Sequence, residues 1–151
     1  MRSKKQKPRE GRTLKIVMTV PGGAVKDKSL RATEDVLQAV PDLDGIFAIN
    51  DPTALGALAA VEKAGKLGRI VIVGFDGEIE ACRAIREGKI YADVVQHPDQ
   101  IARKTVELIV KYMRGEKVPS QYLIPVTLYK REDALKDPRL KTEARRKNSG
   151  G

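Results

Sequence analysis

The sequence predicts an α/β protein with a mostly parallel sheet, because short apolar runs alternate along the chain with segments of helical periodicity. The 151 residues suffice for one domain with a buried core, and only 4% of them are aromatic, so the core must be built from aliphatic side chains. Strands that alternate with helices favour a three-layer α/β/α arrangement, with helices on both faces of the sheet. We expect strand and helix to alternate four times before a final strand.

The first three elements end at clear breaking residues. Residues 14–20 form an apolar run that predicts a strand, which Pro21 stops. Apolar residues at helical spacing predict a helix over 28–39, and it ends before Pro41 because the residue preceding a proline avoids helical geometry. A second buried strand is expected over 46–50.

The next three elements are equally well marked. Asp51 followed by Pro52 predicts a helix start with Asp51 as the N-cap, and Gly65 closes that helix. The third strand lies within RIVIVGFDG, residues 69–77, a β-branched run typical of a strand buried on both faces. A helix follows over 78–87.

The last part of the sequence predicts two strands around the longest helix. Residues 90–96 form the fourth strand, residues 98–114 the long helix, and residues 121–129 an extended segment broken by Pro125. The long helix carries an apolar stripe at helical spacing. The stripe consists of Ala102, Val106, Ile109, Val110 and Met113.

The formal charge of +9 is concentrated at the two ends of the chain. Residues 1–12 carry a net charge of +5 and residues 136–151 a net charge of +4, whereas residues 13–135 are neutral. We therefore expect a lobe over 13–135 between two basic tails with little secondary structure. Nucleic acid is not an expected partner, because the neutral lobe has no broad basic face.

Side chains that serve catalysis or metal binding are scarce. His97 is the only histidine and Cys82 the only cysteine, which excludes a multi-histidine metal site and an internal disulfide. We expect Cys82 in the core and His97 in a solvated loop. The sequence has no glycine-rich phosphate loop and no nucleophile beside a base. We therefore expect no enzyme activity, no catalytic residue, no metal and no cofactor.

Polar side chains stand at the carboxyl ends of three predicted strands, namely Asn50, Asp76 and Gln96. In a parallel sheet these ends share one edge, where ligands bind. Two amides and a carboxylate suit a neutral molecule with many hydroxyl groups. Simpler roles remain open for each residue: Asn50 could begin the turn into the next helix, Asp76 could cap a helix, and Gln96 could be an ordinary surface residue.

Three stretches resemble the carboxyl-terminal lobe of ribose-type periplasmic sugar-binding proteins, the substrate receptors of ABC importers and relatives of LacI-type repressors. They are IFAINDPTALGALAAVEKAGK, VIVGFDG and YADVVQHPDQIARKTVELIVKYMRGEKV. The resemblance implies a type I periplasmic-binding-protein fold, in which two lobes close on a pentose or hexose and deliver it to an ABC permease. It also implies that Asn50, Asp76 and Gln96 hydrogen-bond the sugar.

The chain departs from the family pattern in ways that reduce the expected affinity. The aromatic ring that stacks on the sugar is replaced by Ala24, and the strand and helix that supply an arginine are not found. The resemblance extends to one lobe only, so we expect weak sugar binding or none by that lobe alone. The family works outside the cytoplasmic membrane, but no export signal or membrane span is recognised, so a periplasmic and a cytoplasmic location both stay open.

The apolar stripe on residues 98–114 predicts an oligomer. The resemblance implies that this helix packs on the other lobe, which leaves it either to fold back on its own sheet or to pair with a second copy. We expect a homodimer through residues 98–114. An alternative function is a non-enzymatic scaffold whose basic tails contact nucleic acid or an acidic partner. A flavodoxin-like enzyme and a repressor effector domain have no supporting motif.

Overall fold

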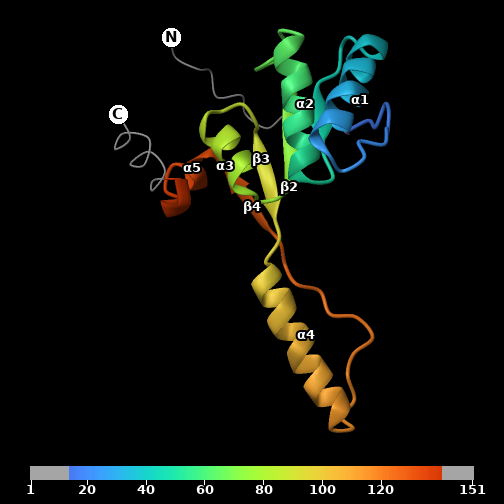
Figure 1. Cartoon of the computed structure of the whole chain (residues 1–151), viewed down its shortest axis with the longest axis vertical. Helices are drawn as coiled ribbons and strands as arrows, with labels where there is room; N and C mark the ends of the chain where they lie inside the picture. Colours follow the sequence, from blue (N-terminus) through green and yellow to red (C-terminus); the bar gives the residue numbers. More distant parts are fainter. Residues whose placement is uncertain (1–13, 141–151) are drawn as a thin grey trace.

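The computed structural model describes residues 14–140, in which helices and strands alternate (Figure 1). The predicted helices are confirmed to within two residues at each end. In chain order the elements are α1 (Lys26–Ala39), β1 (Gly45–Phe47), α2 (Asp51–Lys63), β2 (Val71–Asp76), α3 (Ile79–Arg86), β3 (Ala92–Val95), α4 (Pro98–Met113), β4 (Thr127–Lys130) and α5 (Arg131–Ala134).

The strands form one sheet in the order β1-β2-β3-β4. β1, β2 and β3 are parallel, and β4 joins the edge of β3 antiparallel. Asp76 is paired with Val95, so β2 and β3 end together. The α/β class and the mostly parallel sheet are therefore confirmed.

The core lies between the sheet and the helices α2 and α3. Val61 of α2, Ile72 of β2 and Ile85 of α3 are no more than 1% exposed. α1 packs on α2, where Gly56 allows a close approach because a Cβ at Gly56 would collide with the carbonyl oxygen of Lys26.

The opposite face of the sheet is open in the part of the chain that the structure describes. Phe47 is 67% exposed while its neighbour Ala48 is 1% exposed, and Val71 and Leu128 are also exposed. The connections β1–α2–β2 and β2–α3–β3 advance in one direction across the sheet, so right-handed crossovers place both helices on one face. Residues 14–140 do not form the third layer expected from the sequence.

The strand predicted over residues 14–20 is wrong. This segment has no regular secondary structure, and Leu14 and Ile16 are exposed. A strand requires a neighbour for its backbone hydrogen bonds, and the four strands of the sheet pair only with one another. An apolar run with high β propensity is thus insufficient when no partner lies beside it.

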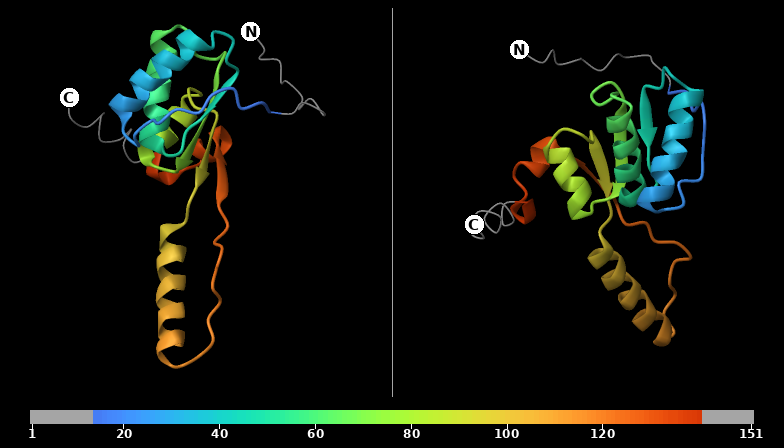
Figure 2. Two further views of the ribbon diagram at one scale, coloured as in Figure 1. Left: turned by 90° about the vertical axis from the view of Figure 1, so that its right-hand side faces the viewer. Right: turned by 45° about the horizontal axis from the view of Figure 1, so that its top comes forward.

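α4 and the return segment to β4 project from the body of the lobe (Figure 1, Figure 2). We call residues 98–126 the α4 arm. α4 has no buried residue, and the stripe residues Val106 and Met113 are 60% and 79% exposed. Residues 121–126 lack strand pairing, so the extended segment predicted over 121–129 becomes a strand only from Thr127. The helix does not fold back on its own sheet.

The packed body continues to the end of the described residues. Leu140 is 4% exposed and belongs to the core cluster, although the sequence assigns it to the basic tail 136–151. The basic tail over residues 1–12 and residues 141–151 of the other tail lie outside the described residues. Among residues 14–140, every helix is too short or too polar to cross a bilayer.

Candidate ligand-binding site

The predicted site residues lie after three neighbouring parallel strands. Asp76 is the last residue of β2, Gln96 follows β3 directly, and Asn50 comes three residues after β1. All three side chains are half-buried. The carboxyl ends of parallel strands share an edge, so the topology assigns the three residues to the same edge of the sheet.

Asp76 and Gln96 are in direct contact. The Gln96 amide nitrogen Nε2 donates a hydrogen bond to Asp76 Oδ1 at 2.6 Å. A hydrogen bond to a charged acceptor is short and strong, so it fixes both side chains. Two of the three predicted residues therefore form one polar unit at the end of β2 and β3.

Asn50 caps α2, a role that the sequence analysis gave to Asp51. Asn50 Oδ1 accepts a hydrogen bond from the Thr53 amide at 3.0 Å, and Asn50 Nδ2 donates to the Ala24 carbonyl at 3.5 Å. Asp51 as N-cap is therefore wrong, because Asp51 is the first helical residue. The long bond to Ala24 is weak, so Nδ2 is the part of Asn50 best able to serve a ligand.

Asp51 instead holds the loop that carries Asp76. Its carboxylate oxygen Oδ2 accepts the amide hydrogens of Gly77 at 3.0 Å and Glu78 at 2.6 Å. Asp76 therefore does not need to cap α3, and its own backbone has a φ of 120°. A non-glycine residue in this region is strained, and such strain persists only where surrounding contacts hold it.

Sequence reasoning missed both Asp51 and Asp93 as buried groups. Both are 0% exposed. Asp51 was assigned as an N-cap because aspartate is preferred at that position. Asp93 could have been recognised from the sequence, because it is a charged residue within the apolar run of the fourth predicted strand. The expected core position of Cys82 is confirmed by its 0% exposure.

Ala24 and His97 lie beside the predicted residues. The Ala24 backbone has a φ of 54°, and its carbonyl faces Asn50. His97 Nε2 lies 2.7 Å from Thr127 Oγ1, which links the segment after β3 to the start of β4. His97 is therefore tied to the sheet through this contact.

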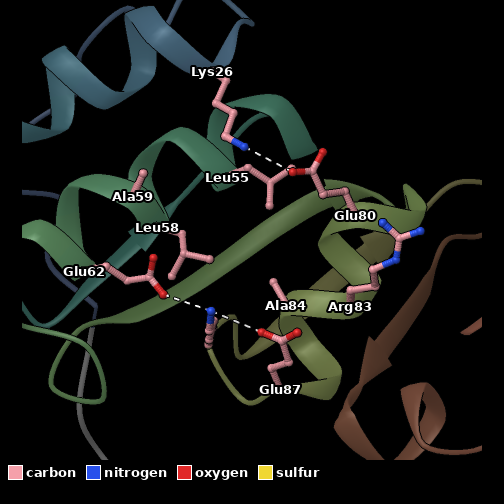
Figure 3. A pocket seen from close by; sticks show the side chains of 10 residues that line it. Lys26, Leu55, Leu58, Ala59, Glu62, Glu80, Arg83, Ala84 and Glu87 are labelled. Atoms are coloured by element: carbon pink, nitrogen blue, oxygen red, sulfur yellow. Dashed lines mark hydrogen bonds and ion pairs between the residues drawn. The ribbon is translucent and has the colours of Figure 1, made fainter. Parts of the chain in front are cut away.

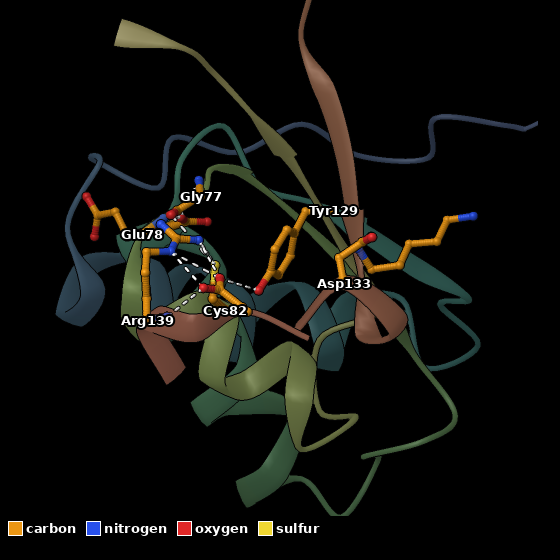
Figure 4. A network of polar contacts seen from close by, with 9 residues as sticks. Gly77, Glu78, Cys82, Tyr129, Asp133 and Arg139 are labelled. Atoms are coloured by element: carbon orange, nitrogen blue, oxygen red, sulfur yellow. Dashed lines mark hydrogen bonds and ion pairs between the residues drawn. The ribbon is translucent and has the colours of Figure 1, made fainter. Parts of the chain in front are cut away.

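A polar network lies around Cys82, Tyr129 and Arg139 (Figure 4). Arg139 Nη2 donates to Asp137 Oδ2 at 2.7 Å, and the Tyr129 hydroxyl donates to the same oxygen at 2.8 Å. Hydrogen bonding to Arg139 lowers the pKa of Asp137 to about 2. Arg139 Nη2 also contacts Cys82 Sγ, whose thiol lies 3.6 Å from the Gly77 carbonyl. The network thus connects the C-terminal segment to the Gly77 loop.

A groove of about 250 Å³ lies elsewhere, between α2 and α3 (Figure 3). Its charged side chains are paired, since Lys26 contacts Glu80 at 3.1 Å and Lys89 contacts Glu62 at 3.2 Å. None of the three predicted site residues lines it. Within residues 14–140, no three His, Cys, Asp or Glu side chains gather in a way that could hold a metal ion.

A mostly parallel sheet with helices between its strands is the arrangement of an open α/β protein. Residues 4–117 match the model of the periplasmic binding protein domain, and the chain belongs to that family. It is 39% identical over 113 residues to the ribose import binding protein RbsB of Salmonella typhimurium. These residues make up 75% of this chain and 38% of that protein. The D-allose-binding periplasmic protein of Escherichia coli is 34% identical over 105 residues, 70% of this chain and 34% of that protein.

Solved structures agree with the sequence relatives. A periplasmic solute-binding protein of Actinobacillus succinogenes with bound D-allose has a TM-score of 0.70 at 29% identity, over 77% of this chain and 41% of that one. A solute-binding protein of Agrobacterium vitis with bound D-fucose has a TM-score of 0.66 at 35% identity, over 78% of this chain and 40% of that one. The chain thus spans 34% to 41% of the length of these relatives and corresponds to a partial lobe of a ribose-type periplasmic binding protein.

Proposed function

We propose that this chain is the sugar-contacting lobe of a binding protein for ABC sugar import, and that Asn50, Asp76 and Gln96 hydrogen-bond a monosaccharide. The observation that carries the proposal is the contact of Gln96 with Asp76 at the carboxyl ends of adjacent parallel strands. This is the edge at which open α/β sheets bind ligands. The proposal excludes catalysis and places the working protein outside the cytoplasmic membrane.

The chemistry of the three side chains supports a polyhydroxylated neutral ligand. Asp76 supplies a carboxylate that accepts hydrogen bonds from hydroxyl groups, and Asn50 and Gln96 each supply an amide donor and acceptor. A carboxylate at the centre of the site disfavours phosphate and other anions. The relatives named for ribose and D-allose, and the structure holding D-fucose, are consistent with a pentose or hexose.

The lobe alone is expected to bind weakly. Asn50, Asp76 and Gln96 are only half-buried in the described chain, so water competes for each hydrogen bond. Ala24 offers no ring for the apolar face of a sugar. We expect a dissociation constant in the millimolar range, equivalent to about −4 kcal/mol.

The test is a titration with D-ribose, D-allose and D-fucose followed by nuclear magnetic resonance. Side-chain amide signals of Asn50 and Gln96 should shift saturably with at least one of the three sugars. Asp76→Asn should abolish the shift, whereas the exposed control Asp35→Asn should retain it. Unchanged Asn50 and Gln96 signals with every sugar would contradict the proposal.

We also propose that two copies associate, with α4 of one copy against the open sheet face of the other. The apolar stripe of α4 and the apolar open face of the sheet are both exposed in one chain. Packing the stripe of one copy on the sheet face of the other would remove both apolar surfaces from water. Burying large aliphatic side chains stabilises by roughly 1.5–3 kcal/mol each. The association is reciprocal, since each copy supplies one α4 helix and one open sheet face.

Light scattering after size exclusion tests this association. The wild-type chain should run as a dimer, and Val106→Glu on the stripe should make it monomeric. Arg103→Glu, a substitution at an exposed position outside the stripe, should stay dimeric. A wild-type monomer at all concentrations would rule the dimer out.

A further inference from the structure

Two acidic side chains meet beneath the ligand edge. Asp51, from the start of α2, and Asp93, from the middle of β3, are both 0% exposed. A Cβ on Gly74 would lie 2.7 Å from Asp51 Oδ1 and 3.2 Å from Asp93 Oδ2, so the two carboxyl groups meet over this glycine. Among the described residues, Asp51 Oδ1 and both Asp93 oxygens have no hydrogen-bond donor.

We infer that Asp51 and Asp93 share one proton, and that this acid pair is the positioning element that fixes the Asp76 carboxylate at the ligand edge. Two buried carboxylates cannot both stay ionised side by side, because each charge is desolvated and they repel. One proton removes a charge and supplies the missing hydrogen bond between the two groups. The remaining oxygen, Asp51 Oδ2, stays free to accept the Gly77 and Glu78 amides.

The connection to Asp76 runs through the backbone. Asp76 directly precedes the two amides that Asp51 holds, and its φ of 120° is strained. On its other side, Asp76 Oδ1 accepts the hydrogen bond from Gln96. The strained residue is thus held between the acid pair and Gln96, and loosening the acid pair should release it.

Electrostatics agree with the geometry. Burial, and then the hydrogen bond with Asp93, raise the pKa of Asp51 to about 8, against the opposing effect of the Glu78 and Gly77 amides. The titration belongs to the pair, because two coupled carboxyl groups lose their protons in joint steps.

Other groups that face the pair do not titrate between pH 4 and pH 8. Cys82 of α3 has a pKa raised by burial, and burial also raises the pKa of Tyr129, which pairs with Asp93 across β3 and β4. The pKa of Asp137 is lowered to about 2 by Arg139, whose own pKa is raised by Asp137. A titration near pH 8 in this part of the core therefore reports the acid pair.

Loss of the proton shared by Asp51 and Asp93 should destabilise the folded chain. The folded pKa lies above the ordinary value of 3.8, so the stabilisation is complete below about pH 4 and is lost as pH rises through about 8. The folding equilibrium constant should fall by at most about tenfold per pH unit in this range. The further consequence, that sugar affinity also falls as pH rises through about 8, rests on the proposed function.

The test is a pH titration of the free protein with labelled aspartate carboxyl carbons. The Asp51 carboxyl carbon, the Gly77 and Glu78 amides, and the Gln96 side-chain amide should shift together with a midpoint near pH 8. Asp93→Asn keeps the shape of the side chain but has no titratable proton, so it should remove this transition and the pH dependence of the folding constant, whereas Asp35→Asn should keep both. If Asp93→Asn does not fold, the wild-type titration decides.

Two outcomes would overturn the inference. An Asp51 carboxyl carbon that titrates near pH 4 would exclude the shared proton. A transition near pH 8 that leaves the Gln96 side-chain amide unmoved would exclude the positioning role. A chain that shows the full transition but no response to D-ribose, D-allose or D-fucose would contradict the proposed function and leave the acid pair intact.

Discussion

α3 and α4 share an amphipathic pattern but differ in burial. In α3, Cys82 and Ile85 are fully buried against the sheet, whereas the 16-residue helix α4 has no buried residue. Both helices follow a parallel strand, but only α3 leads back to another parallel strand and is laid on the sheet by that crossover. An apolar stripe therefore predicts that a helix packs against another surface, but it does not identify that surface.

The largest expected contrast lies between two isoleucines. Ile85→Ala should lower the free energy of unfolding by about 2–5 kcal/mol, because it leaves a cavity in the core. Ile109→Ala in α4, where the side chain is 51% exposed, should change it by less than about 0.5 kcal/mol in the monomer. Urea denaturation of both variants measures the contrast. Equal losses would show that the α4 arm is packed in solution.

A second contrast uses two glycines with positive φ. Gly77 has a φ of 87°, and a Cβ there would lie 2.8 Å from Val95 Cγ2, whereas Gly115 has a φ of 79° and open space around it. Alanine at Gly115 should be destabilising by about 1 kcal/mol from backbone strain alone. Alanine at Gly77 adds the clash and should be destabilising by about 2–3 kcal/mol. Thermal denaturation tests the order, which similar values would contradict.

The smallest contrast concerns ion pairs and pH. Arg139 lowers the pKa of Asp137 to about 2, so this pair contributes stability above the ordinary value of 3.8 that is lost as pH falls toward 2. Arg139 is half-exposed, so we expect the contribution to be about 1–2 kcal/mol. Arg139→Met should therefore reduce the loss of stability between pH 4.5 and pH 2.5. Glu107→Gln in the exposed α4 arm should leave that acid dependence nearly unchanged.

Sequence reasoning placed Asp76 and Gln96 at one sheet edge but missed the groups that support Asp76. Asp76 and Gln96 follow apolar runs, and the parallel order of the strands was enough to bring them together. Asp51 was misread because its neighbour Pro52 gives a strong local signal for a helix start. Its bonds to Gly77 and Glu78 join residues 26 and 27 positions apart, and no local pattern encodes such a contact.

The sequence by itself determined the helices α1 to α4, the alternation of strands and helices from α1 to β4, and the polar residues at the strand ends. These features depend on periodicity, caps and breakers within a few residues. Tertiary structure alone decided that residues 14–20 stay unpaired, that one sheet face and α4 remain open, and that Asp51 meets Asp93. A strand needs a neighbour, an apolar face needs a cover, and a buried acid needs a partner. Each of those partners lies far away in the sequence or was not found among the described residues.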